Sequence, residues 1–344
     1  MKKKLLISDI AKQLNISITT VSFILNGKAK EKRISDSLTA RVLKLVEEVN
    51  YKPNQLAQSL RTGKTKTIGL MVEDISNTFF ANIARLIEEK AYKAGYKIIY
   101  CSTEDDTAKT RDLISMFRDK HVDGYIITPP PGVEEDIKEL IAEGLPVVLL
   151  DRTLPGLPTN FVGVDNRMGS YSATEHLIGQ GYKKIALVTT ESGQSQMLQR
   201  LEGYEQAMAH HQLAPKLLKI PFRVTTEDMI PKIMAFLDDL RQRDDLDAVL
   251  FATNYLALRG LEAIDKLELR VPADVGVVGF DDHDIFRLYK PSVTAVAQPT
   301  EAIADQVINM MLDQLDTDDR KQATTTQTAV LPTSLIVRNS TTRR

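Results

Sequence analysis

Residues 8–27 read SDIAKQLNISITTVSFILNG, and this stretch decides how the N-terminal part of the chain folds. Ser8 is expected to cap a first short helix, and Ser17 a second one over residues 18–26 that Gly27 ends. Apolar side chains recur at helical spacing in both segments, so each helix has one face to bury. Two short helices joined by a tight turn form a helix-turn-helix motif.

The residues that follow complete a small domain. A third helix is predicted to begin after Ser35 and to run to about Asn50, and its apolar face supplies the core that two short helices lack. Pro53 ends this helix, and Asn54 can cap a further short helix that Gly63 closes. A helix of about two turns is marginal in isolation, so its formation depends on a binding partner.

Charge is distributed unevenly along the chain. Residues 1–66 hold 14 Lys and Arg against 5 Asp and Glu, a balance of +9, whereas the other residues hold 30 against 41, a balance of −11. A basic N-terminal fifth of the chain followed by an acidic remainder is typical of a nucleic-acid-binding module joined to a domain with another function. Charge alone leaves open the alternative of a solvated, lysine-rich terminus.

The composition excludes several classes of protein. One cysteine forms no intrachain disulfide, and no apolar run reaches the ~18 residues of a membrane helix or the length of a secretory signal. We therefore expect a soluble, cytoplasmic protein that does not bind membranes. The sequence has no Gly-x-Gly-x-x-Gly, phosphate-loop or Gly-x-Ser-x-Gly motif, and its five histidines lack metal-ligand spacing. It thus predicts no enzyme, no cofactor and no metal site.

Positions across the first sixty residues form a recognisable pattern. They are Asp9-Ile10-Ala11, Ile16-Ser17, Thr20-Val21-Ser22, Leu25-Asn26, Asn50-Tyr51, Pro53-Asn54, Ala57 and Leu60. This pattern resembles the headpiece of lactose/galactose-repressor-type (LacI/GalR) transcription factors. The resemblance implies that the second helix lies in the major groove of DNA and reads base edges. It also implies that the helix after Pro53 forms on cognate DNA, pairs with its dimer mate and enters the minor groove.

The same resemblance implies which residues contact DNA. Ile18, Thr19 and Phe23 hold the base-reading positions, so apolar contacts with thymine methyl groups are expected; alternatively, Phe23 packs into the headpiece core. The basic loop 27–34 suits phosphate contacts. Leu60 would wedge between base pairs, the alternative being a contact with the following domain. The complete set is Ser17, Ile18, Thr19, Thr20, Ser22, Phe23, Asn26, Lys28, Lys30, Asn54, Ala57 and Leu60.

From Thr67 the periodicity changes to short apolar runs that alternate with helical stretches, as in parallel sheets covered by helices. The runs are 67–72, 97–102, 124–128, 146–151, 162–164, 185–190, 217–222, 248–253 and 275–280. Two such series predict two doubly wound lobes. Ligand sites in such folds lie at the carboxyl ends of the strands, so the cleft between the lobes is the expected binding site.

These patterns define the fold class and the domains. The fold class is α/β, with a three-helix helix-turn-helix headpiece and hinge helix before a two-lobed domain of doubly wound parallel sheets. The expected domains are a headpiece (1–53), a hinge helix and linker (54–65) and an effector-binding and dimerisation domain (66–344). The expected first lobe is about 66–160 with 293–322, and the second about 161–290 with 323–340.

Polar and aromatic side chains gather where the predicted strands end. A sugar offers C–H faces to aromatic rings, and hydroxyl groups to carboxylates, amides and guanidinium groups. Residues 66–338 resemble the periplasmic-binding-protein-like effector domain of the same repressor family, and the polar set is similar to that of ribose-binding proteins. One departure is Tyr255, where an acidic residue is common. The effector-binding residues so implied are Asn77, Phe79, Phe80, Asp151, Arg152, Arg200, Phe222, Asn254, Asp281 and Gln298.

The sequence therefore predicts a homodimeric repressor that binds a palindromic operator in double-stranded DNA and is released by a small sugar between its lobes. One alternative is a regulator with a nucleobase-type or phosphorylated corepressor, because Phe79, Phe222 and Arg200 also suit a flat ring. A less favoured alternative is a sugar-binding transport protein. The sequence specifies neither the effector nor the operator.

Overall fold

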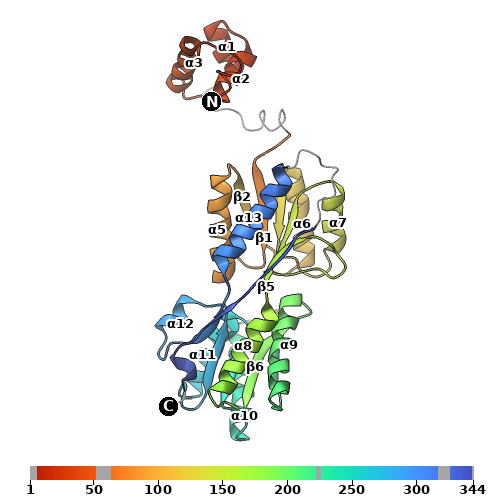
Figure 1. The fold of residues 1–344 in the computed structure, drawn as a ribbon, viewed down its shortest axis with the longest axis vertical. Helices are drawn as coiled ribbons and strands as arrows, with labels where there is room; N and C mark the ends of the chain where they lie inside the picture. The colour runs from red at the N-terminus through yellow and green to blue at the C-terminus, as the bar shows by residue number, and fades with distance from the viewer. Residues whose placement is uncertain (1–5, 52–62, 222–225, 317–325, 343–344) are drawn as a thin grey trace. The chain divides into compact units, whose positions relative to one another are not determined.

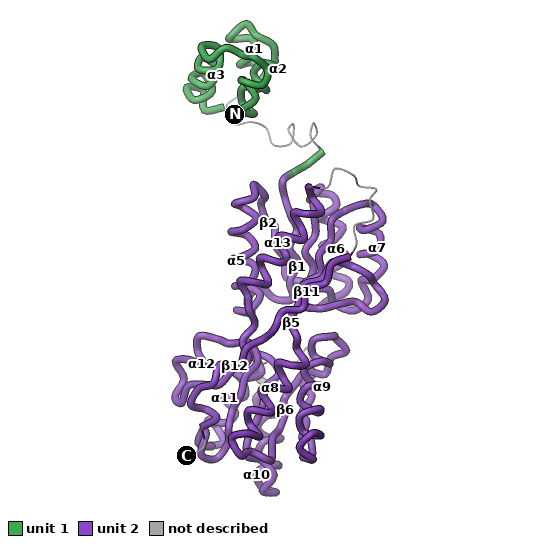
Figure 2. Tube along the Cα trace, in the orientation of Figure 1, with its two compact units in different colours: residues 1–65 green, residues 66–344 purple. Residues whose placement is uncertain are grey.

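The computed structural model describes residues 6–51, 63–221, 226–316 and 326–342. The chain divides into two compact units, Met1–Thr65 and Lys66–Arg344 (Figure 2). No helix in the described ranges is both long enough and apolar enough to span a membrane.

Within its described residues, the first unit contains three helices: α1 (Ile7–Leu14), α2 (Ile18–Leu25) and α3 (Asp36–Glu48) (Figure 1). As predicted, Ser17 caps α2, since its hydroxyl oxygen accepts a hydrogen bond from the Thr20 amide at 3.0 Å. The prediction that Ser8 caps the first helix is wrong. That helix begins at Ile7, two residues earlier than a Ser8 cap implies, and the Asp9 carboxylate reaches back to accept from the Leu6 amide at 2.9 Å.

The three helices share one small apolar core. Each helix contributes one apolar face to this core, as the spacing predicted. The buried residues are Ile10, Ala11, Val21, Ile24, Val42 and Leu45. Burial of this shared face, rather than helix propensity, holds such short helices together.

The second unit begins with a six-stranded sheet in the order β11-β5-β4-β3-β1-β2. Its strands are β1 (Thr67–Val72), β2 (Lys97–Ser102), β3 (Gly124–Ile127), β4 (Val147–Leu150), β5 (Asn160–Val164) and β11 (Thr328–Leu331). All of their pairings are parallel. Both faces are covered, one by α5 (Thr78–Lys93) and α13 (Thr300–Asp316), the other by α6 (Thr107–Asp119) and α7 (Glu134–Ala142).

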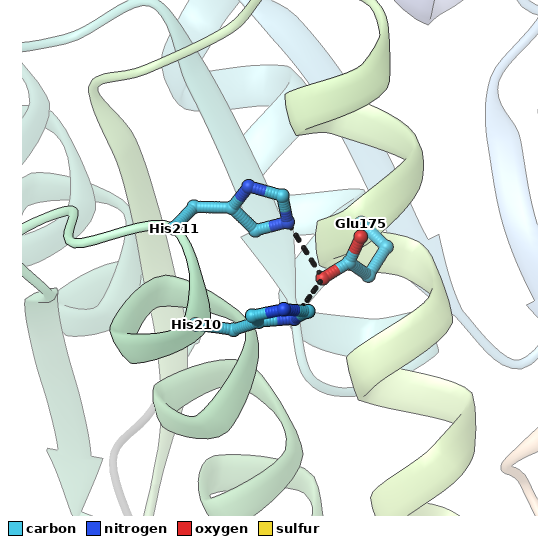
Figure 3. A group of neighbouring side chains, drawn as sticks. All are labelled: Glu175, His210 and His211. Carbon is cyan, nitrogen blue, oxygen red and sulfur yellow. Dashed lines mark hydrogen bonds and ion pairs between the residues drawn. The ribbon is translucent and has the colours of Figure 1, made fainter.

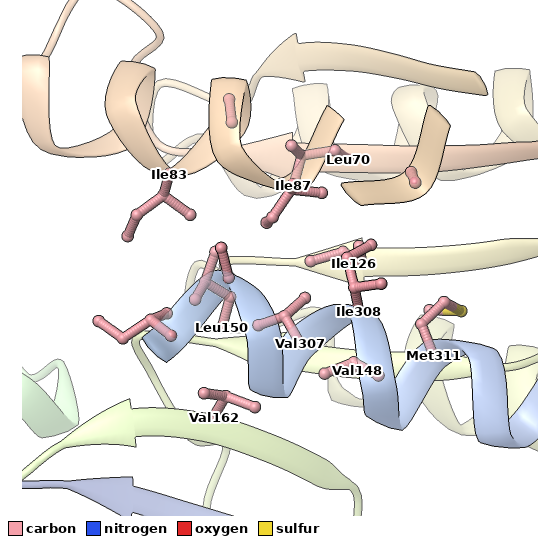
Figure 4. Packing of buried hydrophobic residues seen from close by; sticks show 14 of the residues in the cluster. Leu70, Ile83, Ile87, Ile126, Val148, Leu150, Val162, Val307, Ile308 and Met311 are labelled. Atoms are coloured by element: carbon pink, nitrogen blue, oxygen red, sulfur yellow. The ribbon is translucent and has the colours of Figure 1, made fainter. Parts of the chain in front are cut away.

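The packing in this first lobe explains the uninterrupted apolar runs of its strands. Branched side chains of α5, such as Ile83 and Ile87, and of α13, such as Val307 and Ile308, pack onto one face of the sheet around Val148 (Figure 4). A parallel strand buried on both faces requires apolar residues at successive positions rather than at alternate ones.

The second sheet has the order β12-β10-β9-β8-β6-β7. Its strands are β6 (Ile185–Glu191), β7 (Lys216–Pro221), β8 (Ala248–Phe251), β9 (Gly276–Phe280), β10 (Thr294–Ala297) and the antiparallel β12 (Ser334–Ile336). Helices α8 (Asn166–Gly179) and α9 (Ser195–His210) cover one face. Helices α10 (Thr226–Gln242), α11 (Asn254–Lys266) and α12 (Asp284–Leu288) cover the other, and a short 3-10 helix, η1 (Asn339–Thr341), follows β12. The α/β fold class with two doubly wound lobes is thus confirmed.

The strand order corrects the expected lobe boundaries at three places. Residues 161–164, expected to open the second lobe, belong to β5 in the first sheet, whereas residues 294–297, expected in the first lobe, form β10 in the second sheet. Residues 328–331, expected in the second lobe, form β11 beside β5, with Thr328 opposite Phe161. The chain therefore passes between the lobes after β5, after β10 and after β11 (Figure 1).

Candidate functional site

A pocket lies where the carboxyl ends of the two sheets face each other, and it encloses ≈ 410 Å³, part of which is open to solvent. Eight of the ten predicted effector residues line it: Asn77, Phe79, Phe80, Asp151, Arg152, Arg200, Asp281 and Gln298. The structure therefore brings together residues that are up to 221 positions apart in the sequence. Ligands of doubly wound folds bind at this end of the strands.

The two aspartates occupy equivalent places in the two lobes. Asp151 follows β4 and Asp281 follows β9, and both have a left-handed backbone, with φ of 69° and 67°. This conformation is uncommon for residues other than glycine and tends to occur at functional sites, where the surrounding structure maintains it. Gln298 donates a hydrogen bond to the Asp281 carboxylate at 2.6 Å and fixes its orientation.

Arg152 is almost completely buried and is surrounded by carboxylates. Its guanidinium group forms ion pairs with Glu73 and with Asp105, the latter at 2.7 Å, and lies 3.5 Å from the Asp151 carboxylate. Burial lowers the pKa of Arg152 to about 9, so the side chain still carries its charge at neutral pH. The positive charge is balanced within the protein.

Arg200 is equally buried but has mainly uncharged partners. Its Nε donates to the Asn166 side chain at 2.8 Å and its Nη1 to the Ala252 carbonyl at 2.7 Å, while the Asp281 carboxylate is 3.8 Å away. The guanidinium group also stacks on the Phe280 ring, 3.7 Å from its centroid. Among the described residues these contacts use Nε and Nη1, so Nη2 is available to a ligand.

Hydrogen bonds join the two lobes directly across the pocket. The Gln194 side chain in the second lobe donates to Asp105 in the first at 2.6 Å, and so extends the ion-pair network of Arg152 across the cleft. On another side, Asn254 donates to Asn77 at 2.9 Å. Asn254 thus lies at the site, although it contacts the opposite lobe rather than the pocket. These bonds connect the two lobes on two sides of the pocket.

Burial also changes the proton affinities of groups in the pocket. It raises the pKa of Asp151 to about 7, with the charge of Arg200 opposing the shift and that of Asp281 adding to it. It raises the pKa of Tyr255 to about 12, so this phenol stays protonated and can donate a hydrogen bond. Asp151 is therefore the pocket group whose charge changes near neutral pH.

Seven further residues line the pocket that the sequence analysis did not assign to it: Glu73, Thr190, Gln194, Gln196, Met197, Thr253 and Tyr255. Thr190 lies at the end of β6, next to its last residue Glu191, and Gln194 and Gln196 follow soon after. The rule that ligand sites lie at strand ends would therefore have identified these residues if it had been applied to this strand. In the described part of the chain, the Thr190 hydroxyl and the Gln196 carbonyl oxygen are buried without a hydrogen-bond partner. Phe222 lies outside the described residues.

The surface of α2 carries the residues predicted to read DNA. Ile18 and Thr19 are exposed at its start, and Ile18 has 50% of its surface accessible. Phe23 is half-buried outside the apolar core cluster, with the Lys32 ammonium group 5.5 Å from its ring centroid. Lys28 and Lys30 are exposed in the loop that follows.

Several polar groups of α2 and its caps bond to one another. The hydroxyl groups of Ser17 and Thr20 are 2.8 Å apart, and the Asn26 side chain donates to the Ser22 carbonyl at 2.7 Å. The predicted hinge contacts lie outside the described residues; they are Asn54, Ala57 and Leu60.

Comparison with known proteins agrees with this architecture. Residues 6–54 match the family described as bacterial regulatory proteins, lacI family, and residues 174–341 match the periplasmic binding protein-like domain. The chain is 31% identical over 324 residues to the HTH-type transcriptional repressor PurR of Aliivibrio fischeri, with 92% of this chain and 93% of that protein covered. It is 29% identical over 336 residues to the ribose operon repressor of Halalkalibacterium halodurans, with 97% and 96% covered.

Solved structures show the same fold. The lac repressor dimer bound to operator and the anti-inducer ONPF superimposes with a TM-score of 0.85 at 23% identity, over 98% of this chain and 99% of that one. A regulator from Enterococcus faecium with bound ribose superimposes with a TM-score of 0.69 at 27% identity, over 80% of this chain and 98% of that one.

The protein is a ligand-responsive, DNA-binding transcriptional regulator and not an enzyme. More particularly, the chain belongs to the LacI family, whose repressors bind operator DNA as dimers and respond to small-molecule effectors.

Proposed function

We propose that this protein represses transcription from a palindromic operator and that an uncharged monosaccharide, bound between its lobes, releases it. Support comes from the relatives named above, one called a ribose operon repressor and one holding ribose in its crystal structure. Because its target is chromosomal DNA, we place the protein in the cytoplasm.

The charge balance of the pocket is the observation that carries the choice of effector. Four carboxylates and two guanidinium groups lie at the pocket or directly behind it: Glu73, Asp105, Asp151, Asp281, Arg152 and Arg200. Their sum is negative at neutral pH even when Asp151 is protonated. A phosphorylated effector would therefore meet net repulsion in a site that is only partly open to solvent. An uncharged ligand avoids this cost.

The remaining surface of the pocket suits a polyhydroxyl ring. Phe79 and Phe80 pack edge to face with ring centroids 5.1 Å apart, and both line the pocket. Their apolar surfaces suit the C–H faces of a sugar. Asp151 and Asp281 can each accept two hydroxyl hydrogen bonds, and the unpartnered Thr190 hydroxyl and Gln196 carbonyl oxygen gain partners on binding.

Effector binding is coupled to DNA binding through the geometry of the lobes. The pocket has groups from both lobes, so a ligand that contacts both changes how they meet. We infer that this change is passed to residues 54–65, which connect the headpiece to the first lobe, and weakens the pairing of the two hinge segments on the operator. The operator affinity then falls by the coupling free energy, typically about 1–3 kcal/mol.

A gel-shift titration tests this function. The full chain is bound to DNA from upstream of its own gene, and pentoses, hexoses, sugar phosphates and purines are added in turn. We expect an uncharged sugar to release the DNA, with an affinity change of about 5- to 150-fold. Release by a sugar phosphate alone, or tighter DNA binding in the presence of a purine, would contradict the proposal.

The headpiece geometry supports an apolar mode of base reading. Because the hydroxyl groups of Ser17, Thr20 and Ser22 already bond to neighbouring side chains, Ile18, Thr19 and Phe23 are the side chains most available to the major groove. A thymine methyl group is the base feature that an apolar side chain recognises there. The half-buried position of Phe23 outside the core cluster favours the base-reading alternative over packing in the headpiece.

Replacement of thymine by uracil in the operator tests this mode, because it removes only the methyl group. We expect the wild-type protein to lose affinity when the contacted thymine is replaced, and Ile18→Ala to bind both operators equally. Equal affinity of the wild type for every such replacement would show that no methyl group is read.

A further inference from the structure

Three potential metal ligands meet on the second lobe, away from the pocket. Glu175 lies on α8, His210 is the last residue of α9, and His211 follows it (Figure 3). The Glu175 carboxylate oxygen Oε1 is 2.9 Å from Nε2 of His211 and 3.5 Å from Nδ1 of His210. All three ligand atoms lie within 4.8 Å of one another.

The packing of α8 against α9 places these groups together. A Cβ atom at Gly203 would lie 2.1 Å from the Arg167 carbonyl oxygen, so only glycine lets the two helices approach this closely. Farther along the same pair, Tyr204, Ala207 and Met208 of α9 are fully buried. Glu175 and His210 are therefore held by helix positions, and His211 by the cap that ends α9.

The spacing agrees with the needs of a zinc ion. Ligand atoms at ~2.0–2.1 Å from zinc, on the corners of a tetrahedron, are about 3.3 Å apart. The two measured separations, 2.9 and 3.5 Å, lie on either side of this value. The two carboxylate-to-imidazole separations thus need to change by only a few tenths of an ångström, and the imidazole nitrogens, within 4.8 Å of each other, would turn toward the ion.

The donor set also selects the class of cation. Two imidazole nitrogens and one carboxylate oxygen suit zinc and neighbouring transition metals, whereas magnesium and calcium prefer oxygen ligands alone. Side-chain exposure of 66% for His210 and 36% for His211 leaves the cluster open to an ion from solution. The Tyr171 hydroxyl lies 3.0 Å from Nδ1 of His210 and would give up this contact when that nitrogen binds the ion.

We propose that Glu175, His210 and His211 bind one zinc ion and that the ion fastens the end of α9 to α8. Three protein ligands leave a fourth position for water. The sequence pattern did not predict this site, because its members are adjacent histidines and a glutamate 35 positions before His210. The same two helices carry Arg200 and Asn166, which bond to each other nearer the pocket. By fastening α9 to α8, the ion would therefore also stabilise the position of Arg200, a predicted effector-binding residue.

The test uses the full chain, purified without a histidine tag, and Zn²⁺ itself as the probe, in competition with a chromophoric chelator. We expect the wild type to bind one Zn²⁺ per chain. The Glu175→Gln and His211→Gln variants should each bind Zn²⁺ at least tenfold more weakly than the wild type. Co²⁺ should give the visible absorption of a low-coordinate nitrogen and oxygen site. Bound Zn²⁺ should also raise the Tm of the wild type, because it binds the folded state.

The matched control is His121→Asn, which removes an exposed histidine from the other lobe, at a left-handed position that asparagine tolerates. This control should bind Zn²⁺ as the wild type does. Undiminished binding in Glu175→Gln and His211→Gln, or a wild type that binds no Zn²⁺, would overturn the proposal. Circular dichroism spectra matching the wild type will show that the variants are folded.

Discussion

Each lobe contributes one buried arginine to the effector pocket, and the two are held in opposite ways. Arg152 in the first lobe contacts three carboxylates, whereas Arg200 in the second donates to two uncharged oxygens and has its nearest carboxylate at 3.8 Å. Both have the same chemistry and nearly the same burial. Because their partners differ, we infer that the two arginines have different roles in the site.

The first arginine is part of the framework of the site. It neutralises carboxylates that would otherwise repel one another, and through Asp105 it reaches Gln194 of the opposite lobe. The second arginine has donor capacity left and lies against an aromatic ring, an arrangement suited to a ligand oxygen. Removal of Arg152 should therefore harm stability, and removal of Arg200 should harm effector binding.

The largest expected effect follows from Arg152→Met. This change leaves Glu73, Asp105 and Asp151 together without their cation, and breaking such a buried ion pair costs about 3–5 kcal/mol. Urea denaturation of the full chain measures the loss. The control Arg111→Met, which breaks an exposed first-lobe pair with Asp136, should cost less than about 1 kcal/mol.

A double variant sharpens this prediction. Arg152→Met combined with Glu73→Met removes a cation and a carboxylate together, so the combined loss should be smaller than the sum of the two single losses. Strict additivity would mean that the ion pair between Arg152 and Glu73 does not stabilise the protein as described.

The next largest effect concerns Arg200→Met. A charge-assisted hydrogen bond to a ligand oxygen contributes about 1.5–3 kcal/mol. The effector affinity should therefore fall by between about tenfold and about 100-fold. Calorimetric titration with the releasing sugar measures the affinity. The exposed Arg243→Met should leave it unchanged. An Arg200→Met protein that binds the sugar normally would remove this residue from the site.

A smaller effect is expected from pH. Because burial raises the pKa of Asp151 to about 7, and sugar hydroxyls donate to its ionised form, the bound state has a lower pKa than the unbound state. Effector affinity should thus increase as the pH rises from 6 to 8, by up to about tenfold, and level off above that. In Asp151→Asn, titrated in the same buffers, this pH dependence should disappear; if it persists, another group is responsible.

The smallest effect is expected from the bond between the lobes. Gln194→Leu removes the hydrogen bond to Asp105 and should weaken effector binding about threefold, less than the full contribution of a bond to a charged group, because Asp105 keeps its ion pair with Arg152. Gln206→Leu, the same change at an exposed position of α9, serves as the control. An unchanged affinity in Gln194→Leu would show that the ligand alone determines closure.

Sequence patterns predicted the site well where a strand end could be recognised. Asp151-Arg152 and Asp281 each follow a continuous apolar run, so their common location followed from the rule for parallel sheets. Glu73 and Asp105 were missed as partners of Arg152, because ion pairing between distant segments leaves no local signal. The different partners of Arg152 and Arg200 could not be predicted from the sequence for the same reason.

The fold was predicted less well at the crossings between the lobes. The nine apolar runs match β1 to β9, but the residues of β5, β10 and β11 were expected in the wrong lobe. These strands have only 4 or 5 residues, and a strand joins a sheet through backbone hydrogen bonds, which the side-chain pattern does not specify. Their placement depends on packing by distant elements, such as α13 against the first sheet.

The account depends on a pocket whose own carboxylates outweigh its arginines. Calorimetric titration of the full chain with the releasing pentose or hexose, followed by its phosphorylated form under the same conditions, tests this most directly. We predict that the uncharged sugar binds at least 100-fold more tightly than its phosphate ester. Equal or tighter binding of the phosphate ester would show that Arg152 or Arg200 has positive charge to spare, and would contradict the account.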